Sequence, residues 1–201
     1  PWNSIVREPT RRESRMRHKA REIALQGLYQ LEIHKTTELD LIDAFLARTR
    51  QDEWEHFRSR LKEDKSATDQ MDTKHQEFGK KLQETLEFAR NLIQGASLHR
   101  KKLDRVIKHN LESWKLGRLS VLTRNVLRLA VYEMLFQANE VPHRVVINEA
   151  LELTDSFIDE KTKSFVNSVL QKVYDRQRQP QVDSTQTPPI ETTLESAEPN
   201  S

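Results

Sequence analysis

The chain has 201 residues, of which 35% are hydrophobic and 32% are charged, and its formal net charge is +2. These proportions are typical of a soluble globular protein, and no run of about 18 apolar residues suggests a membrane-spanning helix. Because cysteine is absent, disulfides and cysteine-ligated zinc are excluded, which suits a reducing, cytoplasmic location.

The first predicted helix begins near Arg11. Thr10 and Glu13 have the spacing of a capping box, in which each side chain bonds the backbone N–H of the other residue. Residues 1–10 are expected to form a disordered arm before this helix. Small and apolar residues at helical spacing then form a face for packing. They are Ala20, Ala24, Gly27, Leu28 and Leu31.

A second helix is predicted after Thr37. Its apolar stripe consists of Leu41, Ile42, Phe45 and Leu46. Residues 61–77 lack such a stripe and are predicted to be a polar insertion, either a solvated helix extension or a flexible segment. A third helix is predicted from Phe78, with Gly95 at its end and Ser97 as the cap of the next helix.

The fourth helix is predicted to have an apolar stripe that reaches Trp114, and to end at Gly117. The fifth, residues 120–136, is apolar around most of its circumference, which is typical of a central helix. Pro142 suits the first position of a sixth helix, and a seventh follows. About seven helices without alternating strand patterns predict an all-α fold. Residues 177–201 are expected to be a disordered acidic tail.

Motifs of catalysis, cofactor binding and metal binding are missing from the sequence. There is no H-x-x-x-H pair, no glycine-rich phosphate loop and no G-x-S-x-G motif. Carboxylates are plentiful, but on amphipathic helices they are mostly solvated or paired within the helix. We therefore expect no catalytic residue, no metal site and no cofactor.

Positive charge is concentrated at the start of the first helix. From Arg7 to Arg21 there are seven basic and two acidic residues, a net charge of +5 in a chain of net charge +2. Cations at a helix N-terminus oppose the helix dipole, at a cost of about 0.3–1 kcal/mol each. This concentration of positive charge fits both a solvated basic helix end and a nucleic-acid-binding site. The predominance of arginine favours nucleic acid, because guanidinium groups bind phosphate bidentately and stack on bases.

Four blocks of the sequence resemble the NusB family of transcription antitermination factors. They are "RHKAREIALQGLYQLEI" (17–33), "LDRVIKHNLESWKLGRLSVLTRNVLRLAVYEML" (103–135), "VPHRVVINEALELTDSF" (141–157) and "KSFVNSVLQKV" (163–173). They occur in the family's order. The resemblance implies that residues 11–176 form an RNA-binding domain of two small packed helical bundles, interrupted by the polar insertion.

The resemblance also implies a function and partners. NusB family members recognise boxA-type single-stranded RNA together with NusE, a small-subunit ribosomal protein, and support the transcription of ribosomal RNA. Other Nus factors and RNA polymerase are implied as indirect partners. A homodimer of the free protein is an open alternative, and no membrane partner is expected.

Matching the family's motifs onto this chain gives the candidate RNA-binding residues. They are Arg12, Arg15, Arg17, His18, Lys19, Arg21, Tyr29, Lys161, Lys163, Phe165 and Asn167. Helical spacing alone favours a core position for Phe165, which shares its face with Val169 and Val173, and Tyr29 is similarly ambiguous. Lys161 and Lys163 also fit a solvated helix start.

Two positions outside this set carry further expectations. Ser168 stands where the family usually has a glycine, which suggests a different backbone approach there. Arg128, on the apolar fifth helix, is expected to be paired. Glu149 or Glu152 on the sixth helix is the expected partner, so that the "INEA" motif joins helices.

Two other functions are alternatives. NusB-like domains also occur fused to ribosomal RNA cytosine methyltransferases, which need a Rossmann domain with a glycine-rich loop after the helical part, whereas this chain ends in a polar tail. A protein-interaction module without sequence-specific RNA binding would also explain the basic helix.

Overall fold

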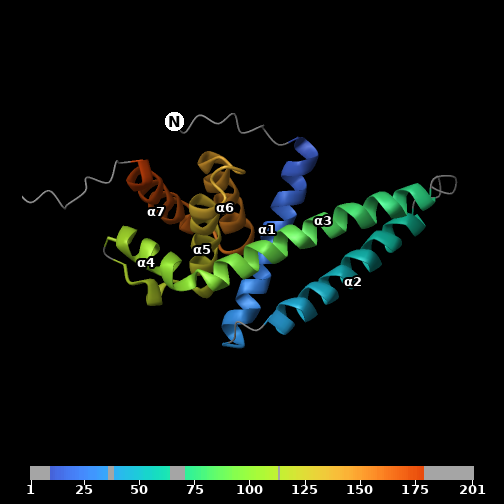
Figure 1. Cartoon of the computed structure of the whole chain (residues 1–201), viewed down its shortest axis with the longest axis horizontal. Coiled ribbons are helices and arrows are strands. Elements are labelled where there is room, and N and C mark those ends of the chain that lie inside the picture. Colours follow the sequence, from blue (N-terminus) through green and yellow to red (C-terminus); the bar gives the residue numbers. More distant parts are fainter. Residues whose placement is uncertain (1–9, 36–38, 64–70, 113, 179–201) are drawn as a thin grey trace, which may run out of the picture.

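The computed structural model describes residues 10–35, 39–63, 71–112 and 114–178, and within them it confirms the all-α prediction (Figure 1). The elements are α1 (Arg11–Ile33), α2 (Leu39–Glu63), α3 (Met71–Leu98), α4 (Arg100–Asn110), the 3-10 helix η2 (Leu116–Arg118), α5 (Val121–Phe136), α6 (His143–Phe157) and α7 (Glu160–Arg178). None of the described helices is both long and apolar enough to cross a membrane. The predicted arm lies outside the described residues except for Thr10. The predicted tail lies outside them except for Gln177 and Arg178, which form the end of α7.

Two groups of helices meet at α1. On one side α1 packs against α2 and α3, and on the other it contacts α5 and α6, while α5 is further covered by α4 and α7. Figure 1 shows α2 and the first half of α3 running side by side as an arm that projects away from α4–α7. The two small bundles expected from the sequence therefore share α1, and α3 also contacts α4 and α5.

The start of α1 has the predicted capping box. Thr10 N–H donates to Glu13 Oε2 at 2.7 Å, and Glu13 N–H donates to Thr10 Oγ1 at 3.2 Å. Further along α1, Gly27 faces α3 so closely that an added Cβ would lie 2.6 Å from Ile93 Cδ1. The small residues of this face therefore allow the close approach of α1 and α3.

The predicted end of the third helix at Gly95 is wrong. α3 continues through Gly95 and Ser97 to Leu98. Tyr132 of α5 lies directly over Gly95, where an added Cβ would be 2.1 Å from the tyrosine Cζ. This glycine makes room for a neighbouring helix and does not end its own.

The polar segment 61–77 is helical wherever the structure describes it, because α2 reaches Glu63 and α3 begins at Met71. The described parts therefore agree with the predicted alternative of a helix extension, and residues 64–70 lie outside the described residues. Aromatic rings join the two helices of the arm. Phe57 and Phe78 stack with centroids 3.9 Å apart, and His75 stacks on Trp54 at 6.1 Å.

The fourth helix is shorter than predicted. α4 ends at Asn110, Trp114 follows outside any helix, and Gly117 lies in η2. The central position predicted for α5 is confirmed, because ten of its 16 residues are buried. α6 begins at His143 with Pro142 as its N-cap, one residue later than expected.

Candidate nucleic-acid interface

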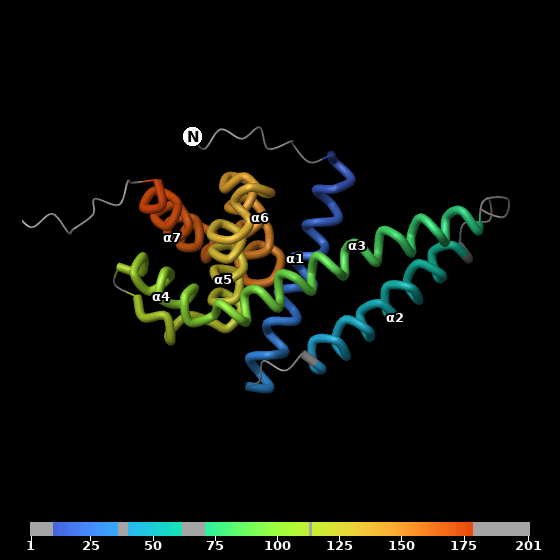
Figure 2. Tube along the Cα trace, viewed as in Figure 1, coloured from blue at the N-terminus to red at the C-terminus, as the bar shows by residue number. Residues whose placement is uncertain are grey.

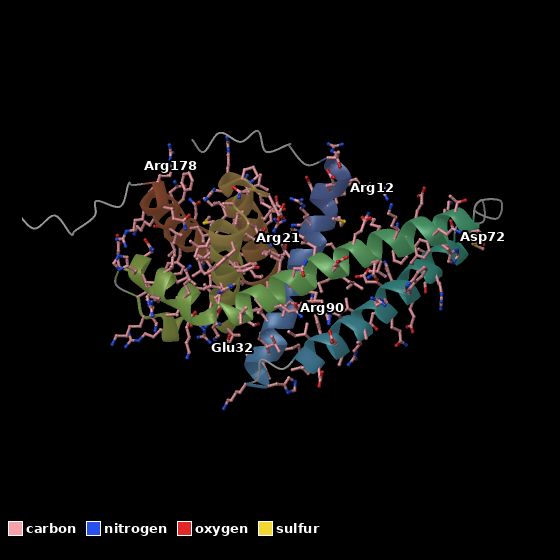
Figure 3. All side chains as sticks on the ribbon, viewed as in Figure 1. Arg12, Arg21, Glu32, Asp72, Arg90 and Arg178 are labelled. Atoms are coloured by element: carbon pink, nitrogen blue, oxygen red, sulfur yellow. The ribbon has the colours of Figure 1, made fainter. Side chains whose placement is uncertain are left out.

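The first two turns of α1 present exposed arginines. Arg11, Arg12 and Arg15 are all exposed, and none of them forms an ion pair within the described part of the chain. Figure 3 places Arg12 at the free end of α1, beyond the packed part of that helix. We call these three residues the α1 head. Its guanidinium groups are free to bind an anion.

Arg17 lies at the border between the head and the packed part of α1. Its side chain is half-buried, and its guanidinium carbon lies 5.6 Å from the ring centroid of Phe88 on α3. Arg21 lies over the same ring at 5.8 Å. These cation–π contacts hold α1 against α3. No pattern in the sequence predicts this role of Phe88.

Arg21 is not a surface residue, and its prediction as an RNA ligand is corrected. Its side chain is 2% exposed, and it binds Glu133 of α5 through Nη2 at 2.6 Å and Nε at 2.9 Å. Nη1 also lies 3.3 Å from Glu149 Oε2 of α6. Burial alone would lower the pKa of Arg21, but the bonds to Glu133 and Glu149 outweigh it and raise the pKa. A guanidinium paired in this way cannot reach a phosphate.

His18 faces carboxylates instead of open solvent. Its Nδ1 lies 2.9 Å from Glu149 Oε2 and 3.4 Å from Glu152 Oε2, and its Nε2 lies 3.5 Å from Glu22 Oε1. His18, Glu149 and Glu152 have potential ligand atoms within 4.8 Å of one another, a spacing that would suit a divalent cation. Glu149 is already hydrogen-bonded to His18 and paired with Arg21, so these contacts account for its position without a metal.

Lys19 is likewise engaged by acidic groups. Its Nζ lies 3.2 Å from Glu53 of α2 and 3.4 Å from Glu22. Burial would lower the pKa of Lys19, and the two carboxylates more than offset this and raise it. A phosphate would have to compete with these carboxylates for both His18 and Lys19, so they are weaker candidates than the α1 head.

Tyr29 is 38% exposed but lies far from the α1 head. It is 14 residues beyond Arg15, which corresponds to about 21 Å along an α-helix. The structure therefore does not bring this ring together with the arginines of the head.

The remaining candidates lie in the first turns of α7. Lys161 and Asn167 are exposed, whereas Lys163 Nζ pairs with Asp155 Oδ1 at 3.3 Å. Phe165 is partly buried and packs against the core, and its ring centroid lies 5.9 Å from that of Trp114. Trp114 itself is 58% exposed, although the sequence pattern placed it on the apolar stripe of a helix.

Arg128 is paired as expected, but with other partners. Its Nε binds Asp104 Oδ1 of α4 at 2.7 Å, and its Nη1 binds Glu32 Oε2 of α1 at 2.8 Å. Glu32 also binds Arg124. Burial would raise the pKa of Glu32, but the two arginines outweigh it and lower the pKa. The "INEA" motif does join helices through Glu149, whose partners are His18 and Arg21 of α1.

Comparison with known proteins gives matches of sequence over much of the chain. The model described as "NusB family" matches residues 52–175. The transcription antitermination protein NusB of Bacillus cereus (strain B4264) is 43% identical over 93 residues, which are 46% of this chain and 71% of that protein. The NusB of Bacillus anthracis (strain CDC 684 / NRRL 3495) matches to the same extent.

Solved structures agree. The structure of T. maritima NusB is 28% identical, covers 79% of this chain and 90% of that chain, and has a TM-score of 0.56. A structure of the antitermination factors NusB and NusE in complex with dsRNA is 24% identical with a TM-score of 0.54, covers 81% of this chain and 98% of that chain, and shows the same fold. The resemblance seen in the four sequence blocks is confirmed, and the chain belongs to the NusB family.

Proposed function

We propose that this protein is an RNA-binding transcription antitermination factor that recognises boxA-type single-stranded RNA together with NusE and supports ribosomal RNA transcription. The observation that carries the proposal is the α1 head, in which Arg11, Arg12 and Arg15 are exposed and have no carboxylate partner among the described residues. Guanidinium groups in such a position suit the phosphates of RNA. Relatives of this chain are named transcription antitermination proteins.

The buried contacts of α1 support this role. Arg21 fixes the helix to α5 and α6 only two turns after Arg15, and Arg17 packs on Phe88. The head therefore extends from a rigidly held helix, so fewer degrees of freedom are lost when it binds a ligand.

Two further expectations about partners stay predictions from the sequence. They are the indirect contacts with other Nus factors and RNA polymerase, and a homodimer of the free protein. The names of the relatives favour a binding factor over a methyltransferase domain. Binding of the head to an acidic protein is the second candidate, favoured by the same three arginines.

Direct RNA binding is expected to depend on sequence and on salt. A boxA-type oligonucleotide should bind at least about tenfold more tightly than a scrambled oligonucleotide of equal length and composition, a difference of about 1.4 kcal/mol. If three to five phosphates are neutralised, the logarithm of affinity should fall against the logarithm of salt concentration with a slope of about −2 to −3.5. Fluorescence anisotropy measures both quantities. Equal affinity for the two RNAs would contradict sequence recognition and leave only non-specific attraction.

A NusE-type protein is expected to form a one-to-one complex with this chain and to tighten its RNA binding. By thermodynamic linkage, RNA must then tighten the protein–protein contact by the same factor. Isothermal titration calorimetry with and without the RNA measures both. Absence of any association at micromolar concentrations would refute NusE as the partner while leaving direct RNA binding untouched.

A further inference from the structure

α4 presents basic side chains that the described fold does not neutralise. The helix has five basic residues and one acidic residue among its 11 positions, a net charge of +4. The acidic residue, Asp104, is bound by Arg128 of α5. Three of the basic side chains are exposed and form no ion pair within the described part of the chain; they are Lys101, Arg105 and Lys108. Their charges are therefore available to an acidic partner.

An exposed leucine lies in line with these cations. Leu98, the last residue of α3, is 81% exposed. Helical hydrogen bonding continues across the junction of α3 and α4, where Leu103 N–H donates to His99 O at 3.0 Å. Leu98 is three residues before Lys101, so it lies one turn earlier on the same side of the helix. We call the surface formed by these four side chains the α4 face: Leu98, Lys101, Arg105 and Lys108.

Residues 190–198, "IETTLESAE", have a sequence pattern that complements the α4 face. Their three glutamates stand four and then three residues apart, the same intervals that separate the three cations of the α4 face. Ile190 and Leu194 each precede one of these glutamates. At helical spacing, such a segment has an acidic stripe beside an apolar one. No basic residue occurs between positions 179 and 201, so the glutamates have no basic neighbour in the sequence.

The end of α7 brings this segment within reach of α4. Arg176 Nη1 donates to His109 O at 2.9 Å, so the last turn of α7 lies at the C-terminal end of α4. The 11 residues of α4 extend over about 16 Å. Residues 179–189 can span up to about 36 Å when extended. The chain can therefore return to the start of α4 before residue 190.

The α1 head is the other exposed basic surface, and it fits this segment less well. Its three arginines stand one and then three residues apart, which does not match the spacing of the glutamates. Figure 2 shows α4 and α7 together at one end of the molecule, with α5 and α6 between them and the start of α1. A tethered segment has the highest effective concentration at a surface close to its attachment point, which favours the α4 face.

We propose that residues 190–198 dock on the α4 face of their own chain. Glu191 pairs with Lys101, Glu195 with Arg105 and Glu198 with Lys108. Ile190 then lies against Leu98. Each exposed ion pair is weak by itself, but a short tether supplies a millimolar effective concentration. The docked segment neutralises α4 and keeps nucleic acids and other polyanions away from it, so the α1 head stays the accessible basic surface.

The test measures where the segment lies in the full chain. Because the chain has no cysteine, Ser196→Cys gives a single attachment site for a nitroxide spin label. The label should broaden the backbone amide NMR signals of residues 98–108 most strongly, and raising the salt concentration to about 1 M should reduce this broadening, since exposed ion pairs are then screened. A mixture of spin-labelled, NMR-silent chains with unlabelled, isotope-enriched chains should show no broadening, because the contact lies within one chain.

Charge exchange tests the central pair. Arg105→Glu and Glu195→Arg should each lower the docked population at least about twofold, the scale of one exposed ion pair. The two substitutions together should restore it. Arg60→Glu on the exposed surface of α2 changes the charge equally and should have no effect.

Three outcomes would overturn the proposal. Strongest broadening at residues 11–15 would place the segment on the α1 head, and broadening in the mixed sample would make the contact one between two copies of the chain. Absence of broadening, or no restoration by the charge exchange, would show that the α4 face does not bind the segment. No RNA is present in these measurements, so their result is independent of the proposed function.

Discussion

Replacing Glu133 with alanine is expected to lower the free energy of unfolding by about 3–5 kcal/mol, the usual cost of removing one partner of a buried ion pair. Arg21 and Glu133 are each 2% exposed at the side chain, and two guanidinium nitrogens of Arg21 bind the carboxylate. The variant leaves a buried cation whose remaining carboxylate, Glu149, is 3.3 Å away. That contact should keep the loss near the lower end of the range. Urea denaturation followed by circular dichroism measures it.

Two variants serve as controls for this prediction. The double variant Arg21→Met with Glu133→Leu removes both charges and should be more stable than Glu133→Ala alone, because no unpaired charge is left in the core. Asp155→Ala breaks the exposed pair with Lys163 and should cost only about 0.2–1 kcal/mol. A loss in Glu133→Ala no larger than that in Asp155→Ala would show that the Arg21 pair is not buried in solution.

The triple variant Arg11→Glu, Arg12→Glu and Arg15→Glu is expected to weaken RNA binding by at least about 100-fold, or about 2.7 kcal/mol. Each substitution removes a phosphate ligand and places a like charge beside the RNA. The three side chains are exposed and form no ion pair within the described residues, so the fold should be unaffected. Acidic residues in the first turns also interact favourably with the helix dipole. The melting temperature should therefore be unchanged or slightly higher, while anisotropy reports the lost affinity.

A matched triple variant on the arm tests whether position or total charge matters. Arg48, Arg50 and Arg60 of α2 are also exposed, and their replacement by glutamate changes the net charge equally. Charges further away than a Debye length of about 8–10 Å are largely screened, so RNA binding should weaken only a few-fold. Similar losses in the two triple variants would refute the α1 head as the specific contact.

Features set by neighbouring residues could be predicted from the sequence. The capping box depends on Thr10 and Glu13, which are three positions apart, and the apolar circumference of α5 is visible along the chain. The resemblance predicts Arg21 as an RNA ligand because it lies in the basic stretch that matches the family's arginine-rich segment. Its main partner is 112 residues away. One local signal was available, since Arg21 shares a helical face with Ala24, Leu25 and Leu28, at the spacing of a buried stripe.

The predictions for Gly95 and Trp114 were also wrong because neighbouring residues in the sequence do not carry the deciding information. Gly95 fits a helix end by composition, and only the ring of Tyr132, from another helix, shows that it is a packing position. Trp114 lies three residues after Leu111, which suggests continued helical spacing. The helix has already ended at Asn110, so Trp114 is not part of the apolar face of α4, and its side chain is 58% exposed. The exposed α1 head, by contrast, could be predicted, because its arginines depend on no distant partner.

The position of α1 at the junction of the two bundles has a consequence for how the chain folds. α1 is synthesised before the other described helices, yet Glu133 follows Arg21 by 112 residues and Glu149 follows His18 by 131. At about 5–20 residues per second, the ribosome needs roughly 6–22 s to add 112 residues. During this interval the nascent helix lacks the partners that neutralise it. Closing such long loops is also slow compared with the local contacts that dominate most helical bundles. We therefore expect the α2–α3 arm to form early, and the docking of α1 onto α5 and α6 to be the late step of folding.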